Sequence, residues 1–451
     1  MRSVRFVVHE HQRLVVGVGY DDGRGGLATF EDHHFDALAK YRERTESQAF
    51  TLGHRSIRLC QHVGYLRVGS VSLEIYPKLS QDRPEQEWRG LLFHMLRVVS
   101  GVRLAPQDQA PLMHRAGDLF EMLLARFVEL TRALVREGLA RTYREVQENG
   151  TVFRGRLVVG AHLRENFVRK ERLYVAYEVH DADNLPNRIL HRALDRVLKT
   201  TGSPDLARQA EAALADFPDV SLAPIRDSEW STLRFDRRTE RYREALVLAR
   251  MILRDERPDF RWGDQRVIAL LFDMNALFES YLYEALRGLS GVSVRSQSPH
   301  RFWRPATGAA AWLKPDLLVS VHGSSAPIVL DAKWKIPKKG RPADDDLRQL
   351  FAYLHAFGSA EGALVYPRAN GTQTDTSGDF LAGPHSGRVV HLDLFAGGAP
   401  NLVAFRESAR DALGLPGAPT VAEPDPDTAV PSVPFAFASA DPRPPVQEQW
   451  S

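Results

Sequence analysis

Three residues in the C-terminal half, Asp316, Asp331 and Lys333, have the types and spacing of a metal-dependent phosphodiesterase site. Mg²⁺ prefers oxygen ligands and is held in proteins by one or two carboxylates together with water. A metal held by the two aspartates would polarise a phosphoryl oxygen and supply hydroxide near neutral pH, and Mn²⁺ could take its place. The ammonium of Lys333 could position the attacking water or neutralise charge on phosphorus. On spacing alone, an exposed hairpin with ordinary surface charges is an equally good interpretation.

A β-hairpin is expected to position these side chains. The runs 317–321 and 328–335 are rich in strand-forming residues, and the segment between them is typical of a turn. A hairpin folded about Gly323-Ser324 would place Asp316 directly opposite Asp331, with their Cβ atoms roughly 5 Å apart. Two carboxylates this close repel each other unless a cation lies between them.

The second predicted strand has one polar and one apolar face. Asp331 and Lys333 point to the same side, because side chains two apart in a strand share a face. The polar face would therefore gather two acids and an ammonium at one spot. The opposite face is expected to pack on the core, and it consists of Ile328, Leu330, Ala332, Trp334 and Ile336.

Predicted helices on either side of this hairpin carry further polar candidates. Upstream, residues 267–286 have helical apolar spacing, and Glu279 lies on this largely apolar helix. An unpaired carboxylate is costly there, so Glu279 is either a third acid of the metal site or part of an interhelical salt bridge. Downstream, Gln349 and Tyr353 are one turn apart on an amphipathic helix, where they could contact a nucleic-acid backbone or hold a catalytic carboxylate.

At this point the sequence resembles a known fold and family. Asp316, the strand with Asp331 and Lys333, the helical Glu279 and the Gln349/Tyr353 pair together resemble the PD-(D/E)xK nuclease fold. Over about residues 1–405 the chain is similar to the McrC family, the nuclease subunits of the McrBC modification-dependent restriction systems. The similarity is carried by the segments Leu73–Leu79, Phe153–Arg156, Asn187–Leu190, Phe272–Glu279 and Leu330–Lys335.

The resemblance implies cleavage of double-stranded DNA that contains modified cytosine, in particular 5-methylcytosine, in the cytoplasm. It also implies a partner, an McrB-like AAA+ GTPase hexamer that recognises the methylated base and translocates DNA. Asp316 and Asp331 would be the metal ligands, and Lys333 and Glu279 further catalytic residues. The Gln349/Tyr353 pair would support them.

Two basic segments could bind partners of the site. Lys335, Lys338 and Lys339 form a basic loop beside the predicted site and could contact DNA phosphates, although a solvated loop is an equally good interpretation. Arg154 and Arg156 lie in one of the segments that resemble the family. The resemblance favours contact with the partner, and without it they are exposed strand charges.

Composition limits the possible functions. A chain of 451 residues is long enough for two or three domains, and a net charge of +2 restricts any DNA contact to a local patch. The single cysteine, Cys60, excludes internal disulfides and a cysteine zinc cluster. Without an apolar run near 18 residues or a signal-peptide pattern, we expect a cytoplasmic protein that does not enter the membrane. The chain has no Walker A motif, so any nucleotide-driven DNA translocation requires another polypeptide.

The pattern of elements predicts an α+β multidomain protein. Residues 1–95 are β-rich and are expected to dock on a partner, and residues 96–255 are mainly helical with a β-hairpin. Residues 256–405 alternate helix and strand, as an α/β PD-(D/E)xK nuclease domain would. Residues 406–451 are expected to be a disordered tail, because nine prolines lie between residues 416 and 451 and no periodic apolar pattern is present.

Two hairpins are predicted outside the candidate site. Gly69-Ser70 is a two-residue turn between β-forming runs. Asn149-Gly150 is a second such turn, which would join residues 143–147 to residues 152–157.

The sequence therefore favours a Mg²⁺-dependent endodeoxyribonuclease subunit that is activated by a partner AAA+ GTPase and stimulates it. A repair or recombination nuclease of the same fold that acts without a GTPase is the alternative enzyme. A non-catalytic activator that docks on an AAA+ ring is the alternative from another class. The intact trio of Asp316, Asp331 and Lys333 argues against a decayed site.

Overall fold

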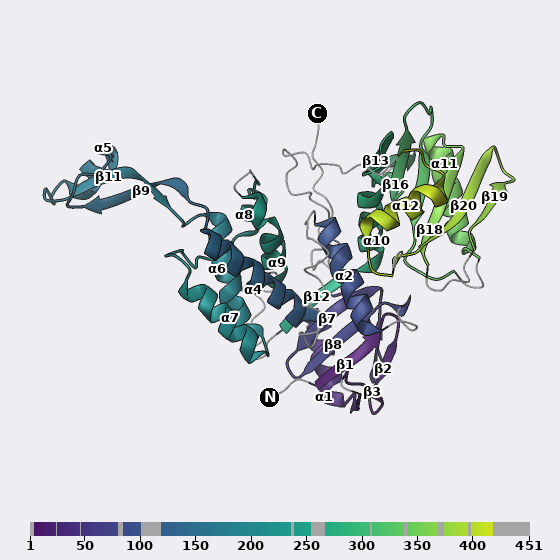
Figure 1. Ribbon diagram of the computed structural model, residues 1–451, viewed down its shortest axis with the longest axis horizontal. Helices are drawn as coiled ribbons and strands as arrows, with labels where there is room; N and C mark the ends of the chain where they lie inside the picture. Colours follow the sequence, from purple (N-terminus) through teal and green to yellow (C-terminus); the bar gives the residue numbers. More distant parts are fainter. Residues whose placement is uncertain are drawn as a thin grey trace. The chain divides into compact units, whose positions relative to one another are not determined.

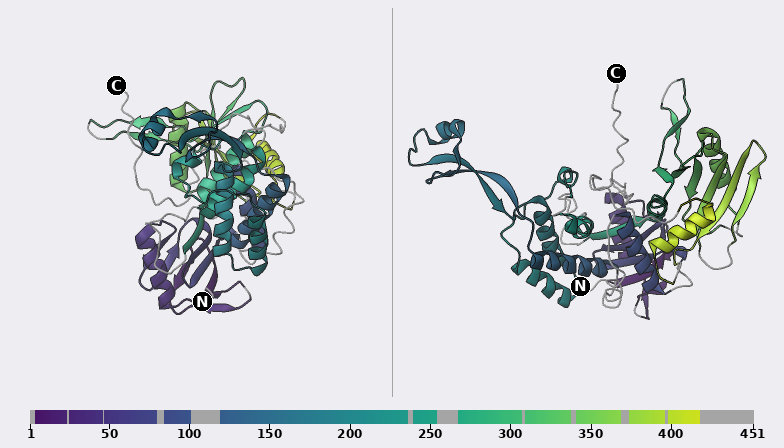
Figure 2. Two further views of the ribbon diagram at one scale, coloured as in Figure 1. Left: turned by 90° about the vertical axis from the view of Figure 1, so that its left-hand side faces the viewer. Right: turned by 45° about the horizontal axis from the view of Figure 1, so that its top comes forward.

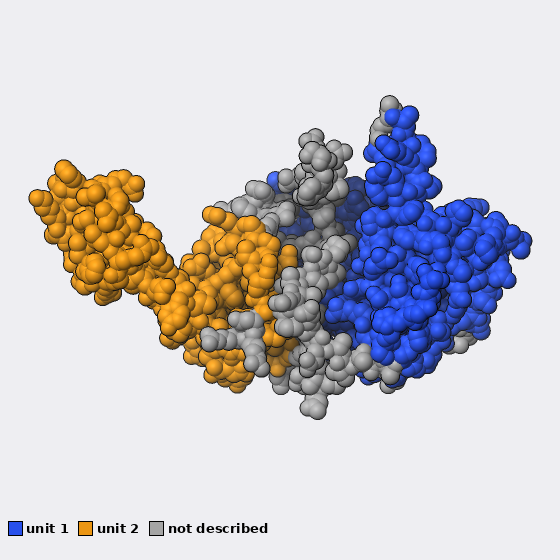
Figure 3. All heavy atoms as spheres, turned by 90° about the horizontal axis from the view of Figure 1, so that it is seen from above, with its two compact units in different colours: residues 1–120, 258–425, 431–451 blue, residues 121–257, 426–430 orange. Residues whose placement is uncertain are grey.

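The computed structural model describes residues 4–23, 25–45, 47–79, 84–100, 119–235, 239–253, 267–306, 309–337, 341–368, 374–395 and 398–417. They form two compact units, which Figure 3 shows in two colours. The described residues up to Phe120 and from Val267 onward belong to unit 1, and those from Glu121 to Leu253 belong to unit 2. Both units contain helices and sheets, which confirms the expected α+β class.

The N-terminal part of unit 1 is built on a four-stranded sheet. Its strands have the order β1 (Val4–His9), β8 (Val71–Tyr76), β7 (His62–Val68) and β12 (Val267–Asp273). The predicted turn at Gly69-Ser70 is confirmed, because Val68 pairs with Val71 in the antiparallel register of β7 and β8. Gly69 has a φ of 57°, in the left-handed region that glycine adopts without strain.

Strand β12 corrects one prediction. Residues 267–286 were expected to be one helix, but Val267–Asp273 form β12, which pairs with β7, and only Met274–Leu286 form the helix α10. Asp273 ends the strand and caps the helix, since its carboxylate accepts hydrogen bonds from the backbone N–H groups of Asn275 and Ala276. A short, continuous apolar run is compatible with a buried strand and with a buried helix. Here the run forms a strand because it pairs with the edge of β7.

Smaller elements complete this part of unit 1. One core joins all of them except the last helix to the four-stranded sheet, with Phe6, Phe30, Phe50 and Ile57 fully buried. A three-stranded sheet has the order β2 (Arg13–Val15), β6 (Ser56–Leu59) and β5 (Phe50–Gly53); β3 (Gly19–Asp21) pairs with β4 (Leu27–Thr29); and the helices are α1 (Asp32–Thr45) and α2 (Glu85–Val99).

The C-terminal part of unit 1 contains a six-stranded sheet. Its order is β13 (Val292–Ser296), β16 (Leu317–Val321), β17 (Ile328–Ala332), β18 (Glu361–Pro367), β20 (His385–Leu392) and β19 (Thr376–Phe380). Strands β17, β18 and β20 are parallel, and the remaining pairs are antiparallel. Helix α11 (Asp344–Phe357) connects β17 to β18, and both α10 and α11 contact β17 (Figure 1). A separate hairpin of β14 (His300–Trp303) and β15 (Ala311–Leu313) lies between β13 and β16 in the sequence.

The predicted start of the tail, residue 406, lies inside a helix. Helix α12 runs from Leu402 to Leu413 and buries Phe405, Ala409 and Leu413. The prolines on which the tail prediction rests begin only at Pro416, after this helix has ended at Gly414. The folded part of the chain therefore includes residues that were assigned to the tail, and residues 418–451 lie outside the described part.

Unit 2 consists of a helical body and an extended arm (Figure 1). The body contains α4 (Leu119–Glu137, which begins at the end of unit 1), α6 (Leu185–Thr200), α7 (Pro204–Ala215), α8 (Asp227–Trp230), the 3-10 helix η3 (Glu240–Tyr242) and α9 (Arg243–Leu253). The arm contains β9 (Thr142–Gly150), β11 (Leu173–Asp181), the short β10 (Arg156–Leu157) and α5 (Val159–Asn166).

The predicted hairpin at Asn149-Gly150 is wrong. Strand β9 continues through both residues and pairs with β11, so that Asn149 lies opposite Tyr174. Strand β10 pairs with β11 and not with β9. The continuous pairing with β11, from Thr142 to Gly150, carries the strand past both residues. Asn149 also exchanges two amide hydrogen bonds with Asn166 of α5, at 2.8 and 2.9 Å.

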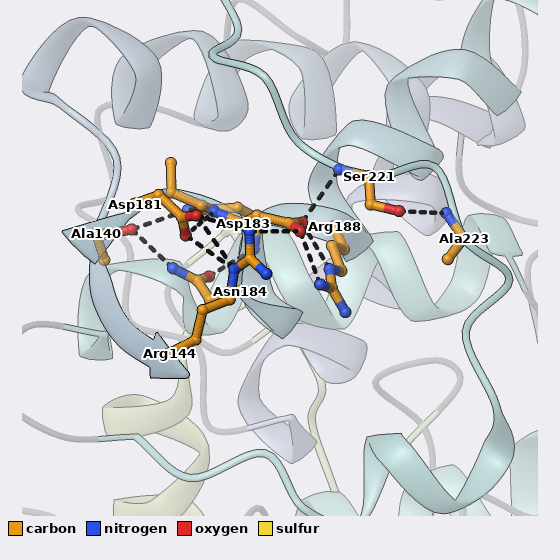
Figure 4. A network of polar contacts seen from close by, with 10 residues as sticks. Ala140, Arg144, Asp181, Asp183, Asn184, Arg188, Ser221 and Ala223 are labelled. Atoms are coloured by element: carbon orange, nitrogen blue, oxygen red, sulfur yellow. Dashed lines mark hydrogen bonds and ion pairs between the residues drawn. The ribbon is translucent and has the colours of Figure 1, made fainter. Parts of the chain in front are cut away.

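A polar network holds the base of the arm to the helical body of unit 2 (Figure 4). Arg144 of β9 binds Asp181 of β11 at 2.8 Å, and Arg188 of α6 binds Asp183 at 2.6 Å. Asn184 donates a 2.8 Å hydrogen bond to the carbonyl of Ala140, and the neighbouring Asn187 donates to the same carbonyl at 2.9 Å. The hydrogen bond and charge of Arg188 lower the pKa of Asp183 to about 2. The Asn187–Leu190 segment therefore anchors the arm.

The helices of unit 1 and unit 2 differ in length, and α4 is a long one with 19 residues. None of the described helices is sufficiently long and apolar to span a membrane.

Candidate functional site

The predicted hairpin of the candidate site is confirmed in its register. Leu317 pairs with Leu330 and Val319 pairs with Ile328, which is the pairing that a turn at Gly323-Ser324 requires. Asp316 immediately precedes β16, and its Oδ2 accepts a 2.7 Å hydrogen bond from the backbone N–H of Ala332. The carboxylate of Asp316 thus lies beside the end of β17 that carries Asp331.

The expected polar face of the hairpin is not a solvent face. Asp331 is only 1% exposed, and Val329 on the same side of β17 is fully buried. This side packs on Leu350 and Leu354 of α11. The reason is that β17 lies inside a sheet with a parallel neighbour, and such strands are covered on both faces. Of the predicted apolar face, Leu330, Ala332 and Trp334 are buried, whereas Ile336 is 44% exposed and lies beyond the strand.

Lys333 connects the aspartate pair to α11. Its Nζ lies 2.6 Å from Asp331 Oδ2 and donates a 2.9 Å hydrogen bond to Gln349 Oε1. Gln349 Nε2 in turn donates to the hydroxyl of Tyr353 at 2.8 Å, and that hydroxyl donates to the carbonyl of Lys314 at 3.2 Å. The structure therefore brings together the predicted lysine, glutamine and tyrosine in one chain of hydrogen bonds.

Burial and mutual repulsion make this site unfavourable for two negative charges. Burial raises the pKa of Asp316 to about 8, and the charges of Asp331 and Glu279 add to this rise. Burial also raises the pKa of Asp331, while the charge and hydrogen bond of Lys333 oppose the increase. One ammonium balances the charge of one carboxylate, so a further positive charge would stabilise the ionised form of the second carboxylate.

Glu279 approaches the site from α10. Its carboxylate accepts a hydrogen bond from the side chain of Gln297, which lies between β13 and β14. Burial raises the pKa of Glu279, whereas Gln297 and the charge of Lys314 lower it, and the charge of Asp331 raises it. Among the described contacts of Glu279 there is no interhelical salt bridge, which was the predicted alternative. The hydrogen-bond partner of its carboxylate is the side-chain amide of Gln297. Glu279 is therefore electrostatically linked to the aspartates.

The predicted basic loop is described in part. Lys335 pairs with Asp346 at the start of α11 at 2.7 Å, and Asp346 also accepts a 3.1 Å hydrogen bond from the hydroxyl of Tyr366. This pair fastens the loop after β17 to α11. Lys338 and Lys339 lie outside the described residues.

Arg154 and Arg156 lie on the arm of unit 2, apart in sequence from the aspartates. Arg156 forms a 3.0 Å ion pair with Glu145 of β9, and both side chains are exposed. The guanidinium of Arg154 lies 5.9 Å from the ring centre of Tyr177. Between them, Gly155 has a φ of +65°, and a Cβ there would lie 2.2 Å from the carbonyl oxygen of Ala176. Only glycine fits this position of the arm.

The segment Leu73–Leu79 has an internal role. Glu74 is buried and binds the guanidinium groups of Arg5 and Arg89, the latter at 2.8 Å. It also accepts hydrogen bonds from the Tyr76 hydroxyl at 2.7 Å and from the backbone N–H of Leu119 at 3.2 Å. These contacts lie within unit 1, so the carboxylate that marks this segment stabilises the unit and is not available for docking.

Sequence reasoning missed several residues that hold the site. Gln297 and Lys314 are bonded to predicted site residues although neither was predicted. Trp334 follows Lys333 directly, and its indole donates a 3.1 Å hydrogen bond to Glu10, 324 positions earlier in the chain. A contact over such a distance has no local sequence signal. The positive φ of Gln297, 50°, is likewise visible only in the structure.

The fold and the buried carboxylate–lysine site define a two-unit α+β protein with an acidic centre in unit 1. The family described as McrBC 5-methylcytosine restriction system component matches residues 57–367. The chain belongs to this family, as the resemblance of its motifs predicted.

Solved structures that are similar to this chain include two from Thermococcus gammatolerans. One is a refined half-complex from a tetradecameric assembly of McrB AAA+ hexamers with bound McrC; it has 21% sequence identity and a TM-score of 0.66 and covers 90% of this chain and 99% of that chain. Another is a cryo-EM structure of the McrBC complex, with 21% identity and a TM-score of 0.47, covering 62% of this chain and 87% of that chain. The search of curated proteins gave no match.

Proposed function

We propose that the chain is the metal-dependent DNA endonuclease subunit of a 5-methylcytosine restriction system, and that the C-terminal part of unit 1 is a PD-(D/E)xK nuclease domain. The observation that carries this proposal is the position of Asp316 beside the end of β17, where Lys333 is 2.6 Å from Asp331. Two adjacent carboxylates suit a metal ion that polarises a phosphoryl oxygen, and an ammonium beside them suits the charge that develops on the phosphate.

The donor set suits Mg²⁺. Asp316 and Asp331 would hold the ion, because burial raises the pKa of both carboxyls and a bound cation would stabilise their ionised forms. Within the described ranges, no group of three or more Asp, Glu, His or Cys side chains is arranged to hold a metal. Mg²⁺ uses one or two protein carboxylates and keeps several waters. Mn²⁺ has similar ligand preferences and could replace it.

When bound, the metal supplies Lewis acidity at a phosphoryl oxygen. Lys333 forms an ion pair with Asp331 in the free site and would stabilise negative charge that develops on a phosphate bound there. Gln349 and Tyr353 fix the direction of the Lys333 ammonium through their hydrogen bonds. Glu279, which accepts a hydrogen bond from Gln297, would act as the third acid of the site and accept a proton there.

The proposed partner is an McrB-like AAA+ GTPase hexamer, and the arm of unit 2 is the proposed contact. The solved relative with a TM-score of 0.66 contains McrB AAA+ hexamers with bound McrC. In this chain the arm exposes large apolar side chains together with Arg154 and Arg156, as an interaction surface would. These apolar residues are Tyr143, Val152, Phe153, Val159, Leu163, Phe167 and Val168.

A plasmid-cleavage assay tests the proposed function. The full chain, the GTPase partner, GTP and Mg²⁺ should cut plasmid that contains 5-methylcytosine, and the Asp331→Asn variant should not. Cleavage by the wild-type chain without the partner would instead support the stand-alone nuclease. Cleavage at the wild-type rate by Asp331→Asn would refute the assigned site. Stimulation of GTP hydrolysis without any cleavage would favour the non-catalytic activator.

A further inference from the structure

The hairpin of β14 and β15 exposes aromatic side chains. Phe302 is 61% exposed, Trp303 57% and Trp312 52%. The hairpin pairs with itself alone and extends away from the six-stranded sheet (Figure 2, right, teal-green). Its register shifts between Arg301 and Trp303, so Phe302 lies in a β-bulge. Bulges redirect side chains and are frequent beside functional sites.

The two ends of this hairpin are hydrogen-bonded to the candidate site. At its start, the side chain of Gln297 binds Glu279, and the backbone N–H of Gln297 donates to the carbonyl of Asp316 at 3.0 Å. At its end, the carbonyl of Lys314 accepts the hydroxyl of Tyr353. These contacts tie both ends of the hairpin to residues of the candidate site.

The charge of the hairpin is positive. Between residues 293 and 315 the sequence contains no aspartate or glutamate. Four basic residues lie in the same interval, and all four are exposed: Arg295, Arg301, Arg304 and Lys314. The guanidinium of Arg301 lies 5.0 Å from the ring centre of Trp312.

Exposed aromatic rings next to arginine are a feature of surfaces that bind nucleic acid. Bases stack on such rings, and arginine pairs with the phosphates. The arm of unit 2 also exposes apolar residues, but it carries acidic side chains such as Glu145 and Glu165 among its basic ones. The absence of acids from residues 293–315 favours an anionic partner for the hairpin.

We infer that the β14–β15 hairpin binds the DNA that is to be cut, with Trp303, Trp312 and Phe302 stacking on bases and Arg301 and Arg304 contacting phosphates. The inference rests on the proposed nuclease function, since the hairpin's ends are joined to Asp316 and Glu279. The hairpin places the backbone of the bound strand at the aspartates, and it binds DNA independently of the base that the partner recognises.

DNA affinity can be measured without cleavage. The full chain with Asp331→Asn is titrated at low salt into a fluorescent 30-base-pair duplex that ends in an unpaired strand of roughly 10 bases, which leaves bases free to stack on the rings. Its affinity is read from anisotropy. The double variant Trp303→Ala/Trp312→Ala should weaken binding at least about tenfold, because each stacked base contributes roughly that much. The double variant Arg301→Gln/Arg304→Gln should reduce the slope of log affinity against log salt by about 1.8.

Matched variants separate stacking from folding. Trp303→Phe keeps a ring and should retain most of the affinity, whereas Arg208→Gln removes an exposed arginine of α7 and should change nothing. Thermal melting should be unchanged in all of them. Wild-type DNA affinity in both double variants would overturn the inference. If these variants bind DNA normally but no longer stimulate the partner's GTPase, the hairpin is a protein-binding surface instead. Cleavage by the Asp331→Asn chain would refute the proposed site but leave the binding result interpretable.

Discussion

Glu10 and Trp334 are joined by a buried hydrogen bond of 3.1 Å, although 324 positions separate them in the chain. The same oxygen of Glu10 accepts the backbone N–H of Lys78 at 2.8 Å. Its other oxygen, Oε2, is buried and has no hydrogen-bond partner among the described residues. Trp334 also packs on Phe278, beside Glu279, with a ring separation of 5.6 Å. Glu10 thus links the N-terminal part of unit 1 to the segment that carries Lys333.

We predict that Glu10→Gln changes how stability depends on pH. Burial raises the pKa of Glu10 to about 7, above its usual value of 4.5. Because the folded state holds the proton of Glu10 more tightly than the unfolded state, protonation of Glu10 contributes to the free energy of unfolding. This contribution is fully present below about pH 4.5 and is lost as the pH rises through 7. The free energy of unfolding of the wild type should therefore fall by about 3 kcal/mol relative to Glu10→Gln between pH 4.5 and 8. Denaturant unfolding of both proteins across this range measures the difference.

The exposed Glu43 of α1 provides the control. Glu43→Gln removes a carboxyl that is not buried, so its effect on the free energy of unfolding should be nearly constant over the same pH range. If Glu10→Gln behaves in the same way as this control, the carboxylate of Glu10 is ionised at no cost in the fold.

Removal of Gln349 should slow cleavage without weakening DNA binding. The Gln349→Leu variant deletes the acceptor that directs the Lys333 ammonium, and misplacement of a catalytic group by about 1 Å can cost on the order of 10²-fold in rate. Single-turnover cleavage should fall by about 10- to 100-fold, whereas KM stays nearly constant. Arg348→Gln is the control, because the neighbouring Arg348 is exposed and pairs only with Asp345 in the described contacts. An equal loss in both variants would indicate general damage to α11.

Lys333→Ala should abolish cleavage for a different reason. It removes the charge that lies 2.6 Å from Asp331 and leaves that buried carboxylate without an ammonium. We expect a loss greater than about 10²-fold in rate, together with a rise in the pKa of Asp331. Circular dichroism should show a folded protein. Cleavage at the wild-type rate by this variant, with Mg²⁺ present, would contradict the role of Lys333.

The hairpin of the site could be predicted because its determinants are local. Gly323-Ser324 determines the position of the turn, and the turn determines the strand register that brings Asp316 beside Asp331. The burial of Asp331 could not be predicted in this way, because it depends on the parallel pairing of β17 with β18, whose residues follow some 30 positions later. The same limit explains β12, whose assignment depends on its pairing with β7.

Long-range contacts also prevent a simple division of the chain into an N-terminal docking fragment and a C-terminal nuclease fragment. Division of the chain near residue 255 would remove β12 from β7 and Trp334 from Glu10. The N-terminal and C-terminal parts of unit 1 are therefore not expected to fold well as separate fragments. The assignment of partner docking to residues 1–95 remains a prediction, and substitutions in the full chain are the better test of it.

Two truncations should differ strongly in stability. A chain that ends at Gly417 keeps all of α12, whereas a chain that ends at Arg410 lacks Leu413 and Leu415, which are buried. It also lacks the carbonyl that accepts a 2.9 Å hydrogen bond from Arg388. Loss of two buried leucines should lower the free energy of unfolding by several kcal/mol. Removal of residues 418–451 alone should change it by well under 1 kcal/mol, since their proline-rich composition offers no periodic apolar face. Thermal melting of the three chains measures both effects.

Gly155→Ala should separate partner stimulation from the nuclease site. A Cβ at this position would lie 2.2 Å from the carbonyl oxygen of Ala176, and the φ of +65° is unfavourable for alanine. The pairing of β10 with β11 must therefore shift, and Arg154 and Arg156 move with it. We expect stimulation of the partner's GTPase to fall at least about tenfold, which corresponds to a loss of about 1.4 kcal/mol.

Gly160 of α5 provides a matched control on the same arm. A Cβ there meets nothing within 4 Å, so Gly160→Ala should leave stimulation unchanged and slightly favour the helix. DNA binding by the β14–β15 hairpin should be normal in both variants, because that hairpin belongs to unit 1. Full GTPase stimulation by Gly155→Ala would show that the conformation of the arm around Arg154 and Arg156 is not what the partner recognises.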